Sequence, residues 1–191
     1  MDVNTAKQLC ILAHKDQWRR PIEMTDQEVH ARFKVESIPI DKYFYLPEGG
    51  RFSYCELNEE YLYEEPYSSH PIAVADMMTT DEEKIVAYLH DVIEDTDWIL
   101  VDNAYGWWLY LPATKEASYQ ELEITENMYE AIYAITRYND HSYKQYLNKV
   151  NKNKLATKVK IADIVHNLSC NPSDHAKQKY LKALPVLLAT L

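Results

Sequence analysis

Cysteine is scarce in this 191-residue chain, and its three positions, Cys10, Cys55 and Cys170, are widely scattered. Because no two of them have the Cys-x-x-Cys spacing and their number is odd, the pattern excludes a disulfide framework and a thiolate zinc site. We therefore expect a reducing, cytoplasmic environment for this protein.

Long hydrophobic runs are also missing. No stretch approaches the roughly 18 apolar residues that a spanning helix requires, and the amino-terminal sequence MDVNTAKQLC has no basic segment followed by an apolar one. We expect neither a targeting segment nor a membrane anchor.

Positive charge is in deficit, with 20 Lys and Arg against 30 Asp and Glu, a formal net charge of −10. This balance argues against a broad nucleic-acid interface, which requires clustered cations, and against anionic membranes as partners. A polyphosphate ligand would need local positive charge from a metal ion and a few basic side chains, since the overall field repels it.

Helical periodicity dominates what is present. With only three Gly and no linker or repeat, the sequence favours one domain over 1–191. We expect helices over Thr5 to Arg19, Thr25 to Val35, Ile72 to Met78, Asp81 to Asp95, Thr125 to Arg137, Ser142 to Val150, Lys154 to Leu168 and from Asp174 towards Leu191. Two aromatic, β-favouring segments, Ile38 to Tyr63 and Trp98 to Leu111, predict hairpins. The predicted class is all-α, a helical bundle with two inserted β-hairpin-like segments.

The sequence HDVIEDT (90–96) ends an apolar helical stretch and holds four ionisable residues. On a continuous helix, Glu94 lies one turn beyond His90, and Asp95 one turn beyond Asp91. A single His-Asp pair is weak evidence, because a histidine at a helix end is more often hydrogen-bonded or solvated than bound to a metal.

Two further segments strengthen the prediction of a metal site. His70 lies upstream beside Pro71, and Asp163 lies downstream within ADIVHN. Two imidazoles and two carboxylates suit Mn²⁺, Fe²⁺ or a Mg²⁺-like ion with open water positions better than a structural zinc ion. Such an ion promotes phosphoester hydrolysis at neutral pH.

Four segments, in order, are AHKDQWRR (13–20), EPYSSHPIAVA (65–75), HDVIEDT (90–96) and VKIADIVHNL (159–168). Together they resemble the hydrolase domain of RelA/SpoT-type proteins and small alarmone hydrolases, within the HD superfamily of metal-dependent phosphohydrolases. The resemblance implies an HD-domain helical bundle, a bound Mn²⁺ or other divalent ion, a small-molecule nucleotide substrate, and hydrolysis of the 3′-pyrophosphate of (p)ppGpp or a closely related nucleotide.

The resemblance also implies roles for individual residues. The metal ligands would be His70, His90, Asp91 and Asp163. Glu94 and Asp95 would be the catalytic pair that positions and deprotonates the attacking water. Arg19, Arg20 and Asn167 would contact the substrate. His14 and His166 are more simply interpreted as packed or hydrogen-bonded residues.

The chain departs from the family pattern at an insertion of approximately 21–64, which separates Arg19 from His70, and again after Asp97. Two alternatives therefore stay open: an HD nucleotidase or nucleoside triphosphate hydrolase, and a non-catalytic nucleotide sensor or inhibitor on the same scaffold. Nothing in the sequence decides whether the chain forms a homo-oligomer.

Overall fold

The computed structural model describes residues 1–33, 44–46, 49–55, 60–111, 118–138 and 141–191. These residues form two compact units. One comprises Met1–Ala13 and His70–Leu191, and the other His14–Ser69. The predicted insertion at 21–64 lies within the second unit, which extends beyond it at both ends. The prediction of a single domain over 1–191 stays a prediction.

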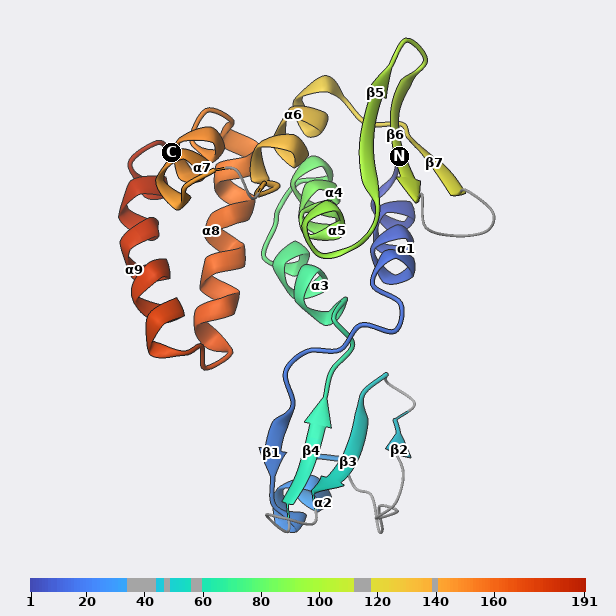
Figure 1. Cartoon of the computed structure of the whole chain (residues 1–191), viewed down its shortest axis with the longest axis vertical. Coiled ribbons are helices and arrows are strands. Elements are labelled where there is room, and N and C mark those ends of the chain that lie inside the picture. Colours follow the sequence, from blue (N-terminus) through green and yellow to red (C-terminus); the bar gives the residue numbers. More distant parts are fainter. Residues whose placement is uncertain (34–43, 47–48, 56–59, 112–117, 139–140) are drawn as a thin grey trace. The chain divides into compact units, whose positions relative to one another are not determined.

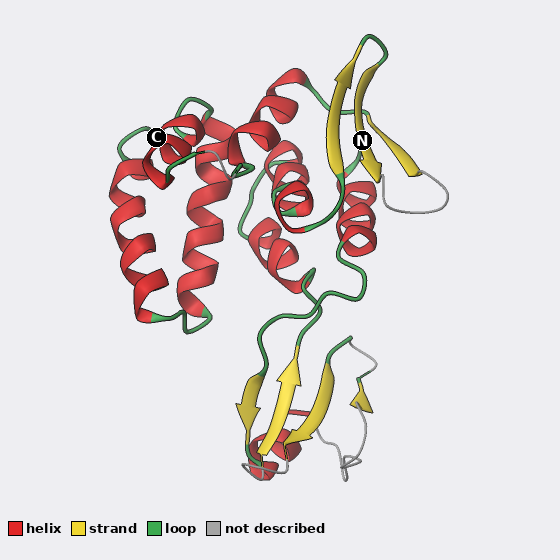
Figure 2. Ribbon diagram, viewed as in Figure 1, coloured by secondary structure: helices red, strands yellow, loops and turns green. Residues whose placement is uncertain are grey.

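The first unit is mainly helical (Figures 1 and 2). Its helices are α1 (Val3–Ala13), α3 (Ser69–Asp76), α4 (Asp81–Leu89), α5 (Val92–Asp95), α6 (Glu126–Ile135), α7 (Tyr143–Val150), α8 (Lys154–Ser169) and α9 (Asp174–Leu188). Helix α8 packs against α4, α6, α7 and α9. Its buried residues Ala156, Val159 and Ile164 are fully enclosed, so α8 supplies the middle of this core.

A three-stranded antiparallel sheet belongs to the same unit, in the order β5 (Ile99–Asn103), β6 (Gly106–Leu111) and β7 (Ser118–Leu122). Asn103 pairs with Gly106 across a two-residue turn, and Gly106 has a positive φ of 127°. That conformation favours glycine. Leu109 and Leu122 join the helical core, so the sheet covers part of it.

The second unit contains a four-stranded antiparallel sheet and one helix. The order is β1 (Ile22–Met24), β4 (Glu60–Glu64), β3 (Arg51–Cys55) and β2 (Phe44–Tyr45), with α2 (Asp26–Phe33) beside them. Phe52 is fully buried and lies in a cluster with Tyr63 and Phe33, whose ring centroids are each 4.9 Å from that of Phe52. This unit has a small aromatic core of its own.

The prediction of a helical bundle is confirmed, but the prediction of an all-α chain with two hairpins was incomplete, because the two β segments form sheets. Strands β1 and β7 were missed. β1 has three residues, too few to show a period, and β7 (SYQEL) has only one aromatic and no β-branched residue. Part of the first predicted hairpin, at 38–43, 47–48 and 56–59, lies outside the described residues.

Three predicted helices differ from the structure by three or more residues, and one of them is α3, which was predicted from Ile72 to Met78 but spans Ser69–Asp76. Helix α1 ends at Ala13 rather than Arg19, and Asp16 has the positive φ of 65° of a left-handed turn residue. The helix predicted from Asp81 to Asp95 is broken, since α4 ends at Leu89 and α5 begins at Val92. The break falls at His90 and Asp91, the two residues that lie between these helices.

Glu83 connects α4 to α8 through an ion pair and also takes part in the amino-terminal cap of α4. Thr80 and Glu83 form a reciprocal capping box, in which Glu83 Oε2 accepts from the Thr80 backbone N–H at 3.1 Å. Glu83 Oε1 accepts from Lys158 Nζ at 2.7 Å. The hydrogen bond from Lys158 is the main cause that lowers the pKa of Glu83 to about 2, with those from Thr79 and Thr80 adding to it. The ionised carboxylate therefore stabilises the fold.

We expect Glu83→Gln to destabilise the protein near neutral pH. A carboxylate with a depressed pKa contributes stability that is complete above its ordinary pKa of 4.5 and is lost as the pH falls towards about 2. The difference in unfolding free energy between wild type and Glu83→Gln, measured by urea denaturation, should therefore shrink over that range. Glu82→Gln, at an exposed position of the same helix, is the control. A difference that does not change with pH contradicts this role.

Candidate metal centre

Four helices bring four side chains together. His70 lies in the first turn of α3, His90 caps the carboxyl end of α4, Asp91 caps the amino end of α5, and Asp163 lies in α8. All four are buried, with at most 8% of each residue exposed. A core that encloses this many ionisable groups requires compensating charge or hydrogen bonds for each of them.

The ligand atoms of these residues surround one point. His70 Nε2 lies 2.9 Å from Asp163 Oδ1 and 3.4 Å from Asp91 Oδ2. His90 Nε2 lies 3.0 Å from Asp91 Oδ1 and 3.8 Å from Asp163 Oδ1. One ligand atom each from His70, His90 and Asp91 lie within 4.8 Å of one another. The four residues expected to bind a metal are thus adjacent in space.

His90 provides a test of whether these residues fit a cation. Its Nδ1 lies 2.6 Å from the Ala87 carbonyl oxygen, to which it donates. The other nitrogen, Nε2, is buried and lies 3.0 Å from Asp91 Oδ1 and 3.8 Å from Asp163 Oδ1, without a hydrogen bond of acceptable geometry. An imidazole whose one nitrogen is held by a backbone carbonyl while the other faces two carboxylates has the usual arrangement of a metal ligand. The residues present therefore fit a divalent ion.

Charge at the cluster supports the same conclusion. Burial acts to lower the pKa of His90, but Asp91 and Asp163 outweigh it and raise the pKa to about 9. The carboxylates thus stabilise positive charge at this point, whether it is a proton on His90 or a divalent ion. Burial opposes the ionisation of Asp163, but Lys160 and the two histidines overcome it and hold its pKa well below the ordinary value.

Lys160, one turn before Asp163 on α8, belongs to the centre and was missed as a site residue in the sequence. Its Nζ lies 2.7 Å from Asp163 Oδ2 and 5.4 Å from the centre of the Tyr146 ring. Burial acts to lower the pKa of Lys160, but Asp163 and Tyr146 raise it well above the ordinary value. The signal available in the sequence was a lysine three residues before the candidate ligand Asp163 on one helix, since residues at that spacing share a face.

The two carboxylates expected to act in catalysis lie at the end of α5. Glu94 Oε2 accepts a hydrogen bond from the backbone N–H of Arg137 at 3.1 Å. Partial burial raises the pKa of Glu94, although much of its side chain faces solvent, and the nearby charge of Lys160 opposes the rise. Asp95 is exposed, and its backbone N–H donates to Asp91 O at 2.9 Å. Glu94 is therefore the better placed of the two to exchange a proton.

The three predicted substrate contacts differ in position. Asn167 Nδ2 donates to Asp163 Oδ1 at 2.6 Å, so its amide orients a carboxylate of the cluster. Arg19 and Arg20 lie in the other compact unit, where the Arg19 backbone N–H donates to Glu65 O at 2.9 Å. Their role in binding a substrate stays a prediction. His14 is buried, with Nδ1 2.8 Å from Gln17 Oε1.

His166 has a closer relation to the cluster than its sequence position indicated. Its Nδ1 lies 2.7 Å from His70 Nδ1, on the side of the His70 ring away from the carboxylates. If His70 Nε2 binds a cation, His70 Nδ1 carries the proton and donates it to His166. This hydrogen bond fixes the tautomer and the orientation of the His70 ring.

Comparisons with known proteins support the fold. No family model and no curated protein matches this chain. The fold of this chain is instead similar to that of one solved structure, and the buried His70, His90 and Asp91 group could hold a metal ion. That structure is described as "A metazoan ortholog of SpoT hydrolyzes ppGpp and plays a role in starvation responses". The TM-score is 0.50, and the match covers 98% of this chain and 84% of that one. Because the sequences are 14% identical, the likeness shows the fold alone, and at that level the predicted resemblance is confirmed.

Among the described helices, none combines the length and the apolar character that crossing a bilayer requires.

We expect His166→Ala to weaken Mn²⁺ binding by about 10- to 100-fold, the usual effect of removing a hydrogen-bond partner from a ligating histidine. Titration calorimetry with Mn²⁺ on protein stripped with EDTA measures this effect. His175→Ala, an exposed histidine on α9, is the matched control and should bind Mn²⁺ as the wild type does. Equal affinity in wild type and His166→Ala excludes the orienting role.

Proposed function

We propose that this protein is a metal-dependent phosphohydrolase that removes the 3′-pyrophosphate from (p)ppGpp or a closely related nucleotide. The observation that carries the proposal is the buried convergence of His70, His90, Asp91 and Asp163 on a SpoT-like fold. The family resemblance in four segments of the sequence supplies the substrate. Hydrolysis by water releases pyrophosphate and leaves GDP from ppGpp, or GTP from pppGpp, as the second product.

The metal is proposed to be Mn²⁺, held by the two histidines and two aspartates. Once bound, a divalent ion lowers the pKa of water and polarises a phosphoryl oxygen, which is the chemistry that this hydrolysis requires. Mixed nitrogen and oxygen ligands suit Mn²⁺, and Fe²⁺ and Mg²⁺ are the nearest substitutes. A nucleotide is accordingly the proposed partner of the site.

The remaining residues move protons and hold charge. Glu94 is proposed to take the proton of the attacking water, and its raised pKa brings it nearer to the solution pH at which a general base is most effective. Asp95 assists by positioning that water. Lys160 keeps Asp163 ionised and places one positive charge beside a site that receives an anionic substrate. Asn167 holds the same aspartate from the other side.

Incubation of EDTA-stripped protein with ppGpp and Mn²⁺, followed by ion-exchange chromatography, tests the proposal directly. We expect GDP and pyrophosphate to form only when the metal is added. GTP, dNTPs and ppApp are run in parallel. If one of these nucleotides is hydrolysed and ppGpp is not, the substrate is that nucleotide rather than the alarmone. If neither ppGpp nor any of the others is hydrolysed, the proposed hydrolysis is contradicted and a nucleotide sensor is favoured.

Two substitutions separate metal binding from proton transfer. Asp91→Ala should abolish Mn²⁺ binding and turnover together. Glu94→Gln should keep the metal and lower kcat by about 10²- to 10⁴-fold, the usual contribution of a general base. Metal content by atomic emission and single-turnover rates measure both effects. Retained turnover in Glu94→Gln removes Glu94 from the mechanism.

A further inference from the structure

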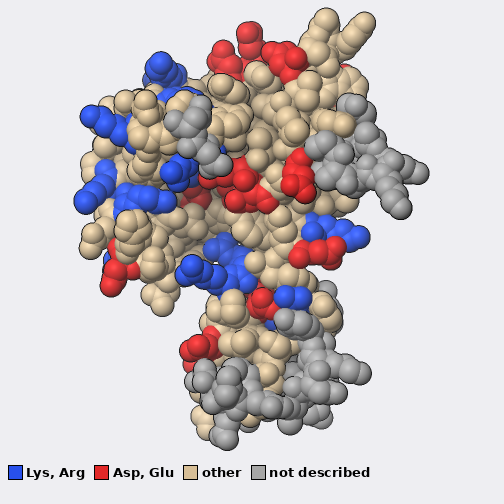
Figure 3. All heavy atoms as spheres, in the orientation of Figure 1, with Lys and Arg blue, Asp and Glu red and all other residues tan. Residues whose placement is uncertain are grey.

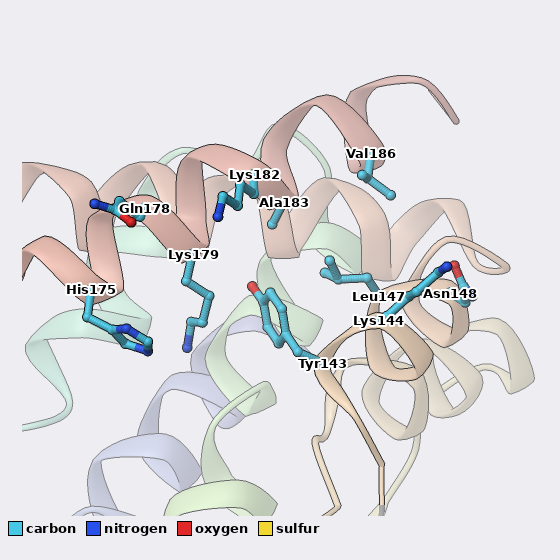
Figure 4. Close-up of a pocket in the computed structure, with 10 residues that line it drawn as sticks. All are labelled: Tyr143, Lys144, Leu147, Asn148, His175, Gln178, Lys179, Lys182, Ala183 and Val186. Carbon is cyan, nitrogen blue, oxygen red and sulfur yellow. The ribbon is translucent and has the colours of Figure 1, made fainter.

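A pocket of about 460 Å³ lies between α7 and α9 in the first unit (Figure 4). This volume falls in the range of roughly 300–1,000 Å³ that is typical of small-molecule sites. Helix α9 contributes His175, Lys179 and Lys182, which share one face because they are spaced by three or four residues. Helix α7 contributes Lys144 to the opposite wall.

Positive charge gathers at this pocket although the chain is acidic. None of the ten residues that line it is acidic, whereas three are lysines. Figure 3 shows Lys and Arg concentrated over α7 and α9. Among the described residues, no carboxylate forms an ion pair with Lys144, Lys179 or Lys182. Like charges at this helical spacing repel one another and destabilise a helix, so the fold itself gains nothing from them.

The pocket also has an apolar wall. Leu147 and Ala183 are buried, and Val186 continues the same surface along α9. The Tyr143 ring stands between the two helices in Figure 4, and its hydroxyl is buried without a hydrogen-bond partner. The ammonium of Lys179 lies 5.0 Å from the centre of that ring, a cation–π contact that positions the cation and leaves its N–H groups free to donate.

We propose that the pocket between α7 and α9 binds an organic phosphate. The phosphate is held by Lys179 and Lys182, with Lys144 and His175 at the rim, and the apolar or aromatic body of the ligand packs on Leu147 and Val186. A small molecule of this kind matches both the unpaired cations and the apolar wall. A purely apolar ligand would leave the lysines unpaired, and inorganic phosphate would leave the wall uncovered.

Two sources of such a ligand share this chemistry. The ligand is either one end of a nucleotide substrate whose other phosphate lies at the metal centre, or a separate organic phosphate that binds only in this pocket. The pocket is near the centre, because the Tyr143 ring that lines it lies 6.0 Å from the Tyr146 ring, and Lys160, which pairs with Asp163, lies 5.4 Å from the centre of that second ring. Binding itself does not require the proposed hydrolysis, so the two can fail separately.

Titration calorimetry of GDP with metal-free wild-type protein in EDTA tests the site. GDP combines a ring with phosphates, so we expect it to bind, and guanosine, which lacks them, to bind at least about tenfold more weakly. The double variant Lys179→Met/Lys182→Met should lose at least about tenfold in affinity for GDP, because it removes two charged donors. Lys179→Arg/Lys182→Arg should keep the affinity, and thermal unfolding checks that each variant is folded.

The matched control is Lys177→Met, an exposed lysine of the same helix that does not line the pocket, and it should bind GDP as wild type does. No binding of GDP to wild type, or equal binding by the double methionine variant, overturns the proposal. Turnover of ppGpp with Mn²⁺ then distinguishes the sources. A raised KM with unchanged kcat in the double variant assigns the pocket to the substrate, and an unchanged KM assigns it to a separate ligand.

Discussion

The enclosure of two imidazoles and two carboxylates at one point is the constraint on which the rest of this structure depends. Buried charges are expensive unless each is compensated, and Asp91 and Asp163 lie against His70 and His90 with almost no access to solvent. Lys160 supplies one fixed positive charge to this cluster. A divalent ion would supply the remainder, so the cluster that is costly for folding is the one best suited to bind a metal.

Helix α8 has the central part in meeting that constraint. It carries Asp163 with Lys160 and His166 on neighbouring turns, and it packs on α4, α6, α7 and α9. The hydrogen bond between Lys158 and Glu83 joins α8 to α4, the helix that ends at His90. The contact between α4 and α8 therefore helps to place His90 near Asp163. The same helices form a pocket between α7 and α9 that is lined by lysines and by no acidic residue. Positive charge is therefore concentrated at one place in an acidic chain.

The four candidate ligand residues could be named in the sequence because metal sites draw on few residue types, and His70, His90, Asp91 and Asp163 stand in segments that resemble one family. The helices were predictable for a related reason: an amphipathic helix repeats its apolar residues over many positions. The short strands β1 and β7 lacked such a repeat. Similarly, the break between α4 and α5 was invisible in an apolar stretch that runs without glycine or proline from Asp81 to Asp95.

By itself, the sequence determined the identities of the candidate ligands, the helical class, and the need for local positive charge in an acidic chain, since each depends on residue type and spacing alone. Only the tertiary structure decided that residues 70, 90, 91 and 163 meet at one buried point, that Lys160 and His166 contact this group, and that lysines of α9 face α7 across a pocket. The physical reason is that such contacts join residues up to 96 positions apart. Local periodicity carries no information about which distant side chains become neighbours when helices pack.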